Sequence, residues 1–184
     1  MIRIIFEKLC ATCYNLTRYD NNRQLVIFMN PTILVANTVL NDAFNKGYSV
    51  TPMKLQKLVY FVYKKYLQDN NRPLFDEPFE VWEHGPVAPS IYQAFKGFSK
   101  KVISEYYRQD GSIFIVSPTN AEFYSALEFV LAAYKDWNGK ELSDATHMKG
   151  GAWQKALDRK ERYLLAEDIT NEGWIIHKEL VANG

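Results

Sequence analysis

The sequence predicts a mostly helical α+β fold, a compact multi-helix bundle around a central helix over residues 52–68. A small antiparallel β element of two or three strands is expected near residues 79–83 and 112–117. Three observations support this class: helical spacing of apolar residues in several segments, two short β-like segments, and turn-forming residues between them. With 184 residues, 47% of them hydrophobic, the chain can bury the core of such a domain.

The central helix has a clear start signal and two apolar stripes. Thr51 can cap its first turn, and Pro52 occupies the first helical position, where a missing N–H costs nothing. The stripes comprise Leu55, Leu58, Val59, Val62 and Tyr66, and Met53, Gln56, Tyr60, Tyr63 and Leu67. The remaining arc is expected to face solvent, although Phe61 interrupts it; it comprises Lys54, Lys57, Lys64, Lys65 and Gln68.

Another helix is predicted just upstream, beginning near Pro31. Its apolar face comprises Ile33, Leu34, Ala36, Asn37, Leu40, Ala43 and Phe44. Gly47 is well placed to end it, and the connection to Thr51 is short. The two helices are therefore expected to be antiparallel neighbours.

A rigid turn is predicted at residues 84–89, directly after a short strand over residues 79–83. The glycine of this HGPVAP sequence reaches backbone conformations that other residues avoid, and each of its prolines fixes one dihedral angle. We therefore expect the turn to orient Trp82 and His84. The strand is expected to form a hairpin-like pair with residues 112–117 on the surface of the bundle.

Downstream, apolar periodicity predicts helices over residues 89–98, 119–137 and 140–147. Asn138 and Gly139 are expected to end the longest of them. The last element is placed at roughly residues 168–181, where Gly173 disfavours a helix.

Residues 1–28 lack clean periodicity, whereas residues 29–184 are expected to form a single domain. The first segment is expected to be either a weakly docked extension or a product of an upstream start codon. Cys10 and Cys13 form a C-x-x-C motif, but the three histidines lie too far away in the sequence to complete a zinc site. We expect no metal and no cofactor. Two cysteines fit a reducing, cytoplasmic compartment.

Composition and motifs favour a binding module over an enzyme. The net charge of +1 gives no electrostatic reason to expect nucleic acid or acidic membranes as partners, and no run of about 18 apolar residues could span a bilayer. The sequence contains no G-x-S-x-G, P-loop, dinucleotide-binding glycine or H-E-x-x-H motif. A small hydrolase remains the less favoured alternative, with Glu83 beside His84 and Asp144 near His147 as acid–base pairs.

Several motifs occur in order: KLQKLVY at residues 54–60, PLF at 73–75, WEHGPVAPSIY at 82–92, and LSDATH at 142–147 followed by Trp153. Together they resemble the Panacea domain family of SocA-like antitoxins. The resemblance covers residues 30 to the C-terminus. It implies a helical fold with a small β element and a protein that neutralises a toxin by direct binding, often in prophages or mobile elements. Delivery of the toxin to a protease is the alternative that it implies, with a protease or chaperone as an additional partner.

The residues of these motifs fall into two predicted groups. Lys54, Lys57, Phe61, Trp82 and His84 are expected to form the partner-binding surface, because aromatic side chains supply burial and lysines select an acidic or polar partner. The other motif residues are expected to be structural: Leu55, Gln56, Leu58, Tyr60, Gly85, Pro86, Val87, Pro89, Tyr92, Thr146, His147 and Trp153.

Overall fold

The structure, a computed structural model, describes residues 2–5, 15–20, 23–28 and 30–176. Its helices are α1 (Pro31–Lys46), α2 (Pro52–Asn70), α3 (Pro89–Phe95), α4 (Ala121–Tyr134), α5 (Gly139–Thr146), α6 (Ala152–Asp158), α7 (Ala166–Thr170) and the 3-10 helix η1 (Lys96–Phe98). Its strands are β1 (Ile2–Ile5), β2 (Asn15–Asp20), β3 (Arg23–Phe28), β4 (Glu80–Trp82), β5 (Gly85–Val87) and β6 (Ile113–Val116). The predicted α+β class with a helical bundle is confirmed. Cys10 and Cys13 lie outside the described residues.

The first two helices begin and end where the sequence signals predict. Thr51 accepts a hydrogen bond from the backbone of Lys54 and caps α2, with Pro52 in its first turn. Gly47 ends α1 in the left-handed conformation, with φ of 74°. Asn30 caps the start of α1 by accepting bonds from the backbone of its first turn.

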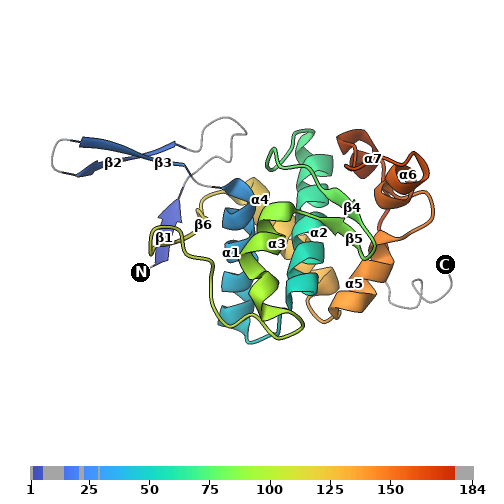
Figure 1. The fold of residues 1–184 in the computed structure, drawn as a ribbon, viewed down its shortest axis with the longest axis horizontal. Coiled ribbons are helices and arrows are strands. Elements are labelled where there is room, and N and C mark those ends of the chain that lie inside the picture. Colours follow the sequence, from blue (N-terminus) through green and yellow to red (C-terminus); the bar gives the residue numbers. More distant parts are fainter. Residues whose placement is uncertain (1, 6–14, 21–22, 29, 177–184) are drawn as a thin grey trace.

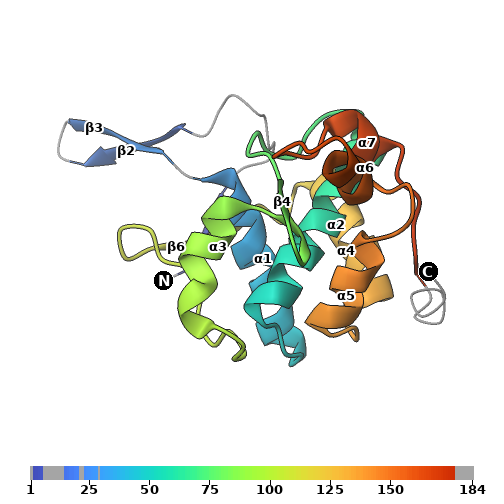
Figure 2. The same cartoon turned by 45° about the vertical axis from the view of Figure 1, so that its right-hand side comes forward.

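Helix α2 is the centre of the bundle. It packs against α1, α3, α4, α5, α7 and β5, and Figures 1 and 2 show these elements on its different sides. Every residue from 54 to 67 except Lys65 is buried. Its aromatic residues make ring contacts in several directions, including Tyr60 with Phe79 and Phe61 with Tyr134. The core of the protein is therefore organised around one nearly enclosed helix.

The prediction that the lysine arc of α2 faces solvent is wrong for three of its five residues. Lys54, Lys57, Lys64 and the interrupting Phe61 are all buried. Downstream segments cover them and supply oxygen partners for the three ammonium groups. Lys54 donates to the carbonyl of Lys135 and Lys57 to that of Pro86, while Lys64 forms an ion pair with Glu172.

Strand pairing also differs from the prediction. Strand β4 does form an antiparallel hairpin, but its partner is β5, which begins three positions after Trp82. Strand β6 pairs instead in parallel with β1, with Ile2 opposite Ile113 and Ile5 opposite Val116. Strands β2 and β3 form a separate antiparallel hairpin, which lies apart from the helices in both views. The structure thus has three two-stranded units in the described residues.

The C-terminal elements are shorter than predicted. Helix α4 ends at Tyr134, and Asn138 caps α5 in a capping box with Glu141 instead of ending α4. Within the described part of residues 168–181, helix α7 ends at Thr170. The chain then crosses α2 without helical structure, which leaves Glu172 buried and Trp174 half-buried. None of the helices among the described residues combines the length and apolar character needed to cross a membrane.

Candidate functional site

Residues 82–88, which we call the 82–88 turn, join β4 to the start of α3 and are fixed to the central helix. Two side chains of α2 bond to its backbone. Gln56 donates to the carbonyl of Ala88 (3.1 Å) and accepts from the N–H of the same residue (2.9 Å). Lys57, the next residue along α2, donates to the carbonyl of Pro86 (2.8 Å). Because all three bonds are buried, the turn cannot leave α2 without stranding polar groups.

Two later helices hold the other end of the turn. The Ser143 hydroxyl on α5 donates to the carbonyl of His84 (2.8 Å), and the Trp153 indole on α6 donates to the carbonyl of Trp82 (2.9 Å). Alternate carbonyls of the turn, at positions 82, 84, 86 and 88, therefore each accept a bond from a side chain of the bundle. The turn is a rigid part of the domain.

Gly85 lies at the tightest point of this arrangement. Its φ is +90°, a backbone conformation that residues with a side chain rarely adopt. A Cβ at this position would collide with Oγ1 of Thr146 and lie 3.0 Å from Nζ of Lys57. The missing side chain is thus what allows α2 and α5 to approach the turn.

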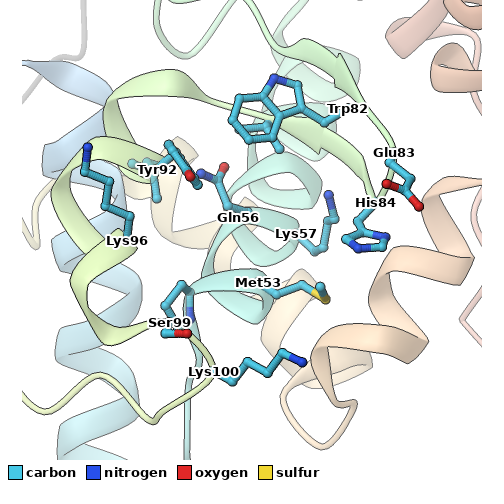
Figure 3. Close-up of a pocket in the computed structure, with 13 residues that line it drawn as sticks. Met53, Gln56, Lys57, Trp82, Glu83, His84, Tyr92, Lys96, Ser99 and Lys100 are labelled. Carbon is cyan, nitrogen blue, oxygen red and sulfur yellow. The ribbon is translucent and has the colours of Figure 1, made fainter.

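A pocket of about 420 Å³ opens beside the turn. Figure 3 shows it between the β4–β5 hairpin, the first turns of α2 and the α3–η1 segment. Its walls are mainly apolar and include Met53, Val87, Ile91, Trp82 and Tyr92. The rings of Trp82 and Tyr92 are in contact, with centroids 4.8 Å apart, yet the two residues are 37% and 40% exposed. They form an accessible aromatic rim.

Lys57 lies at the inner side of the pocket and is unusual because its side chain is both ionisable and buried. It is 1% exposed, and the removal of its ammonium from water lowers its pKa to about 7. No carboxylate of the described residues forms an ion pair with it. By contrast, Lys64 lies two turns further along α2 and pairs with the buried carboxylate of Glu172 at 2.7 Å.

The structure brings together three of the five residues predicted to bind a partner. Lys57, Trp82 and His84 all line the pocket. Lys54 and Phe61 do not, because Lys54 is buried against the end of α4 and Phe61 stacks on Tyr134. Lys54, Lys57 and Phe61, which were predicted to share one exposed face of α2, therefore do not form a single exposed surface.

Several residues of the site were not singled out by the sequence. Ser143, which holds the turn, gave no signal beyond its place in the LSDATH motif. Lys96 and Lys100 stand at the rim and come from a polar stretch after α3 that has no distinctive pattern. Their relation to Trp82 depends on how α3 folds back on α2, which local sequence does not reveal.

The histidines of the hydrolase alternative have no carboxylate hydrogen bond within the described residues. His147 packs on Trp153, with ring centroids 4.0 Å apart, and its Nε2 atom is buried without a partner there. Burial lowers the pKa of His147, and the nearby positive charge of Lys57 acts in the same direction. Neither acid–base pair of that alternative, Glu83 with His84 or Asp144 with His147, forms an ion pair among the described residues. Likewise, no cluster of three metal-ligating side chains occurs among the described residues.

Comparison with known proteins gives the family. The sequence profile of the family described as "Antitoxin SocA-like, Panacea domain" matches residues 55–154, which is more than half of the chain. This chain belongs to the SocA-like antitoxin family. The protein is also similar to Antitoxin SocA of Caulobacter vibrioides (strain NA1000 / CB15N), with 33% identity over 124 residues. That alignment covers 65% of this chain and 66% of the relative, just under two thirds of its length. No solved structure matches the chain.

The Panacea match coincides with the site described above. It includes the buried Lys57 and Lys64 of α2, the whole 82–88 turn, and the Ser143 and Trp153 side chains that hold it. Of the residues that line the pocket, only Pro52 and Met53 precede the matched range. The pocket and its frame are therefore built from the Panacea domain itself.

Proposed function

We propose that this protein is an antitoxin that neutralises a cognate toxin by binding it directly, through the face that carries the pocket. Membership of the SocA-like family supports the antitoxin role. The observation that carries the choice of surface is the exposed aromatic pair Trp82 and Tyr92 at the rim of an apolar pocket. Exposed aromatic residues around a concave apolar surface are typical anchors of protein–protein contacts.

The rigidity of the frame favours binding. A surface that is already in its binding conformation loses little conformational entropy when a partner docks. The carbonyls of Trp82 and His84 are held by bonds from α6 and α5, and Gln56 fixes the other end of the turn. The backbone that carries Trp82 is therefore fixed by the domain itself, without a partner. The proposed setting is the cytoplasm, where an antitoxin meets its toxin before the toxin reaches a target.

Co-expression tests this function. The open reading frame next to this gene would be expressed from a tightly controlled promoter, with and without this chain, and growth would be followed. The proposal predicts that the neighbouring product alone stops growth, that co-expression restores growth, and that the two proteins co-purify. Growth arrest that co-expression does not relieve would contradict it.

The amount of the tagged neighbouring product in the same cells separates two mechanisms. Direct neutralisation predicts an unchanged amount of toxin when growth is restored. A fall in that amount, reversed in a strain that lacks the responsible protease, would replace direct neutralisation by delivery of the toxin for degradation.

A further inference from the structure

Two of the buried lysines of α2, Lys57 and Lys64, differ in their counter-ions. Lys64 has the carboxylate of Glu172 at 2.7 Å, whereas Lys57 has only the carbonyl oxygen of Pro86 at 2.8 Å as a hydrogen-bond partner. A buried ammonium without an opposite charge is costly, and a carboxylate brought near it recovers part of that cost. The ammonium form of Lys57 thus has no anion from its own domain, as far as the structure describes it.

The pocket offers a route by which an anion from outside could approach. Lys57 forms part of its inner side, and Figure 3 places Lys57 between Met53, Trp82 and His84. Lys100 reaches across the opposite rim and forms no ion pair with a described residue. Lys96 stands further out and donates to the side chain of Gln93 (2.6 Å).

The charge balance around the pocket is positive. Three lysines, at positions 57, 96 and 100, line it together with the two titratable groups of the turn, Glu83 and His84. Burial and the nearby charge of Lys57 lower the pKa of His147 at the end of α5, and Asp144, His84 and Lys140 also act on that histidine. The lining thus holds one carboxylate against three lysines, and most of its other surface is apolar. Such a surface selects a partner that is both apolar and acidic.

We propose that the pocket receives a segment of the partner protein in which a large apolar side chain is accompanied by a carboxylate. The apolar group packs between Trp82, Tyr92 and the floor at Met53, and the carboxylate lies in the field of Lys57 and Lys100. This inference rests on the proposed function, since it describes the part of the toxin that this face would hold.

A selection of short peptides tests the chemistry without knowledge of the toxin. The full chain would be used to select random twelve-residue peptides displayed on phage, with the Trp82→Ala variant as counter-selection. The proposal predicts enriched peptides that combine Leu, Met or an aromatic residue with a nearby Asp or Glu. Peptides rich in Lys or Arg, peptides without charge, or no enrichment over the counter-selection would overturn it.

Matched charge variants then locate the carboxylate. The affinity of a labelled selected peptide is expected to fall roughly tenfold in Lys100→Glu and to change by less than about threefold in Lys101→Glu. Lys101 is the matched control because it is exposed and adjacent in sequence but does not line the pocket. Equal effects of the two variants would mean that only the general charge of the segment matters, which contradicts a carboxylate seated in the pocket.

The pH dependence of peptide binding tests the role of Lys57. A carboxylate near Lys57 favours its protonated form, so binding must take up protons and weaken at high pH. We expect affinity about tenfold weaker at pH 9 than at pH 6, with proton uptake visible by calorimetry in buffers of different ionisation enthalpy. Lys57→Met should abolish both effects and His84→Gln should retain them. Binding that is independent of pH, or a pH effect that is lost in His84→Gln instead, would overturn the assignment.

The same measurements separate this inference from the proposed function. If acidic–apolar peptides bind the pocket but the neighbouring gene product does not, the antitoxin assignment fails and the pocket chemistry stands. If that product binds and Lys57→Met and Lys100→Glu leave its affinity unchanged, the pocket chemistry fails and the antitoxin role stands. Dimerisation of the chain that Trp82→Ala abolishes would identify a second copy as the occupant and would also contradict the proposal.

Discussion

Gln56 and Ala88 exchange two buried hydrogen bonds, 32 positions apart in the sequence, and through them the central helix fixes the end of the 82–88 turn. The side-chain amide copies the pattern of a strand partner, because it donates to the carbonyl and accepts from the N–H of one residue. The orientation of the neighbouring pocket wall depends on this pair.

The Gln56–Ala88 pair predicts a large effect of a conservative substitution. Gln56→Leu keeps the size of the side chain but leaves one buried N–H and one buried carbonyl without partners. The unfolding free energy should fall by about 2–4 kcal/mol, measured by urea denaturation. Gln154→Ala, on a partly exposed residue of α6, should change it by less than about 0.5 kcal/mol. Similar losses in both variants would show that the pair does not hold the turn.

Gly85 should tolerate no side chain. Gly85→Ala combines a φ of +90° with a collision between Cβ and Oγ1 of Thr146, and we expect a loss of at least about 3 kcal/mol in unfolding free energy. Gly97→Ala is the matched control, since a Cβ there meets nothing within 4 Å. Adding Thr146→Ala to Gly85→Ala should restore part of the loss. Absence of any restoration would mean that backbone strain alone accounts for the effect.

Lys57 should make the unfolding free energy depend on pH in the neutral to alkaline range. Its pKa is lowered from 10.5 to about 7 in the folded state, so the unfolded chain binds more protons between these two values. Stability therefore rises as pH increases from about 7 to 10, and below about pH 7 the full cost of the buried ammonium is present. The difference in unfolding free energy between wild type and Lys57→Met should change by on the order of 4 kcal/mol across this range. A constant difference would contradict the lowered pKa.

Comparing each variant with wild type at every pH is essential for this experiment. Burial also raises the pKa of Tyr60 and Tyr134, and their contribution to stability is lost at the alkaline end of the range. These tyrosines are the same in both proteins, so their effect cancels in the difference.

The Lys64–Glu172 ion pair predicts strong coupling. Both side chains are 1% exposed, and Glu172 also accepts bonds from the Tyr60 hydroxyl and the Ala152 N–H. Lys64→Met leaves the carboxylate buried without its counter-ion and should cost roughly 3 kcal/mol. The double variant Lys64→Met with Glu172→Gln should recover part of this cost in thermal or chemical denaturation. Strictly additive losses would show that the two charges do not depend on each other.

Local sequence signals predicted the beginning of the bundle well. The caps at Thr51 and Gly47, the proline at the start of α2 and the helical spacing of its apolar residues all act within a few residues of each other. Interactions between residues this close in the chain can be predicted from the sequence alone. The turn after residue 84 was likewise predictable, because glycine and proline restrict the backbone wherever they occur.

Tertiary partners account for what the sequence could not reveal. Lys64 looked solvent-exposed because its counter-ion, Glu172, lies 108 positions away, in the last predicted element, where Gly173 disfavours a helix. The pairing of β4 was missed because strands of three or four residues carry too little pattern to specify a partner. Lys100 joined the site only through the path of the chain after α3, which no local motif indicates.

The central claim is that the rim of this pocket contacts the toxin while its frame only supports it. The most direct test measures, for Trp82→Ala, both the thermal midpoint and the affinity for the toxic product of the neighbouring gene, with Phe129→Ala as an exposed aromatic control on α4. We predict that Trp82→Ala weakens binding at least tenfold, with less change in thermal midpoint than Gln56→Leu produces, and that Phe129→Ala leaves affinity unchanged. Unchanged affinity in Trp82→Ala would contradict the claim.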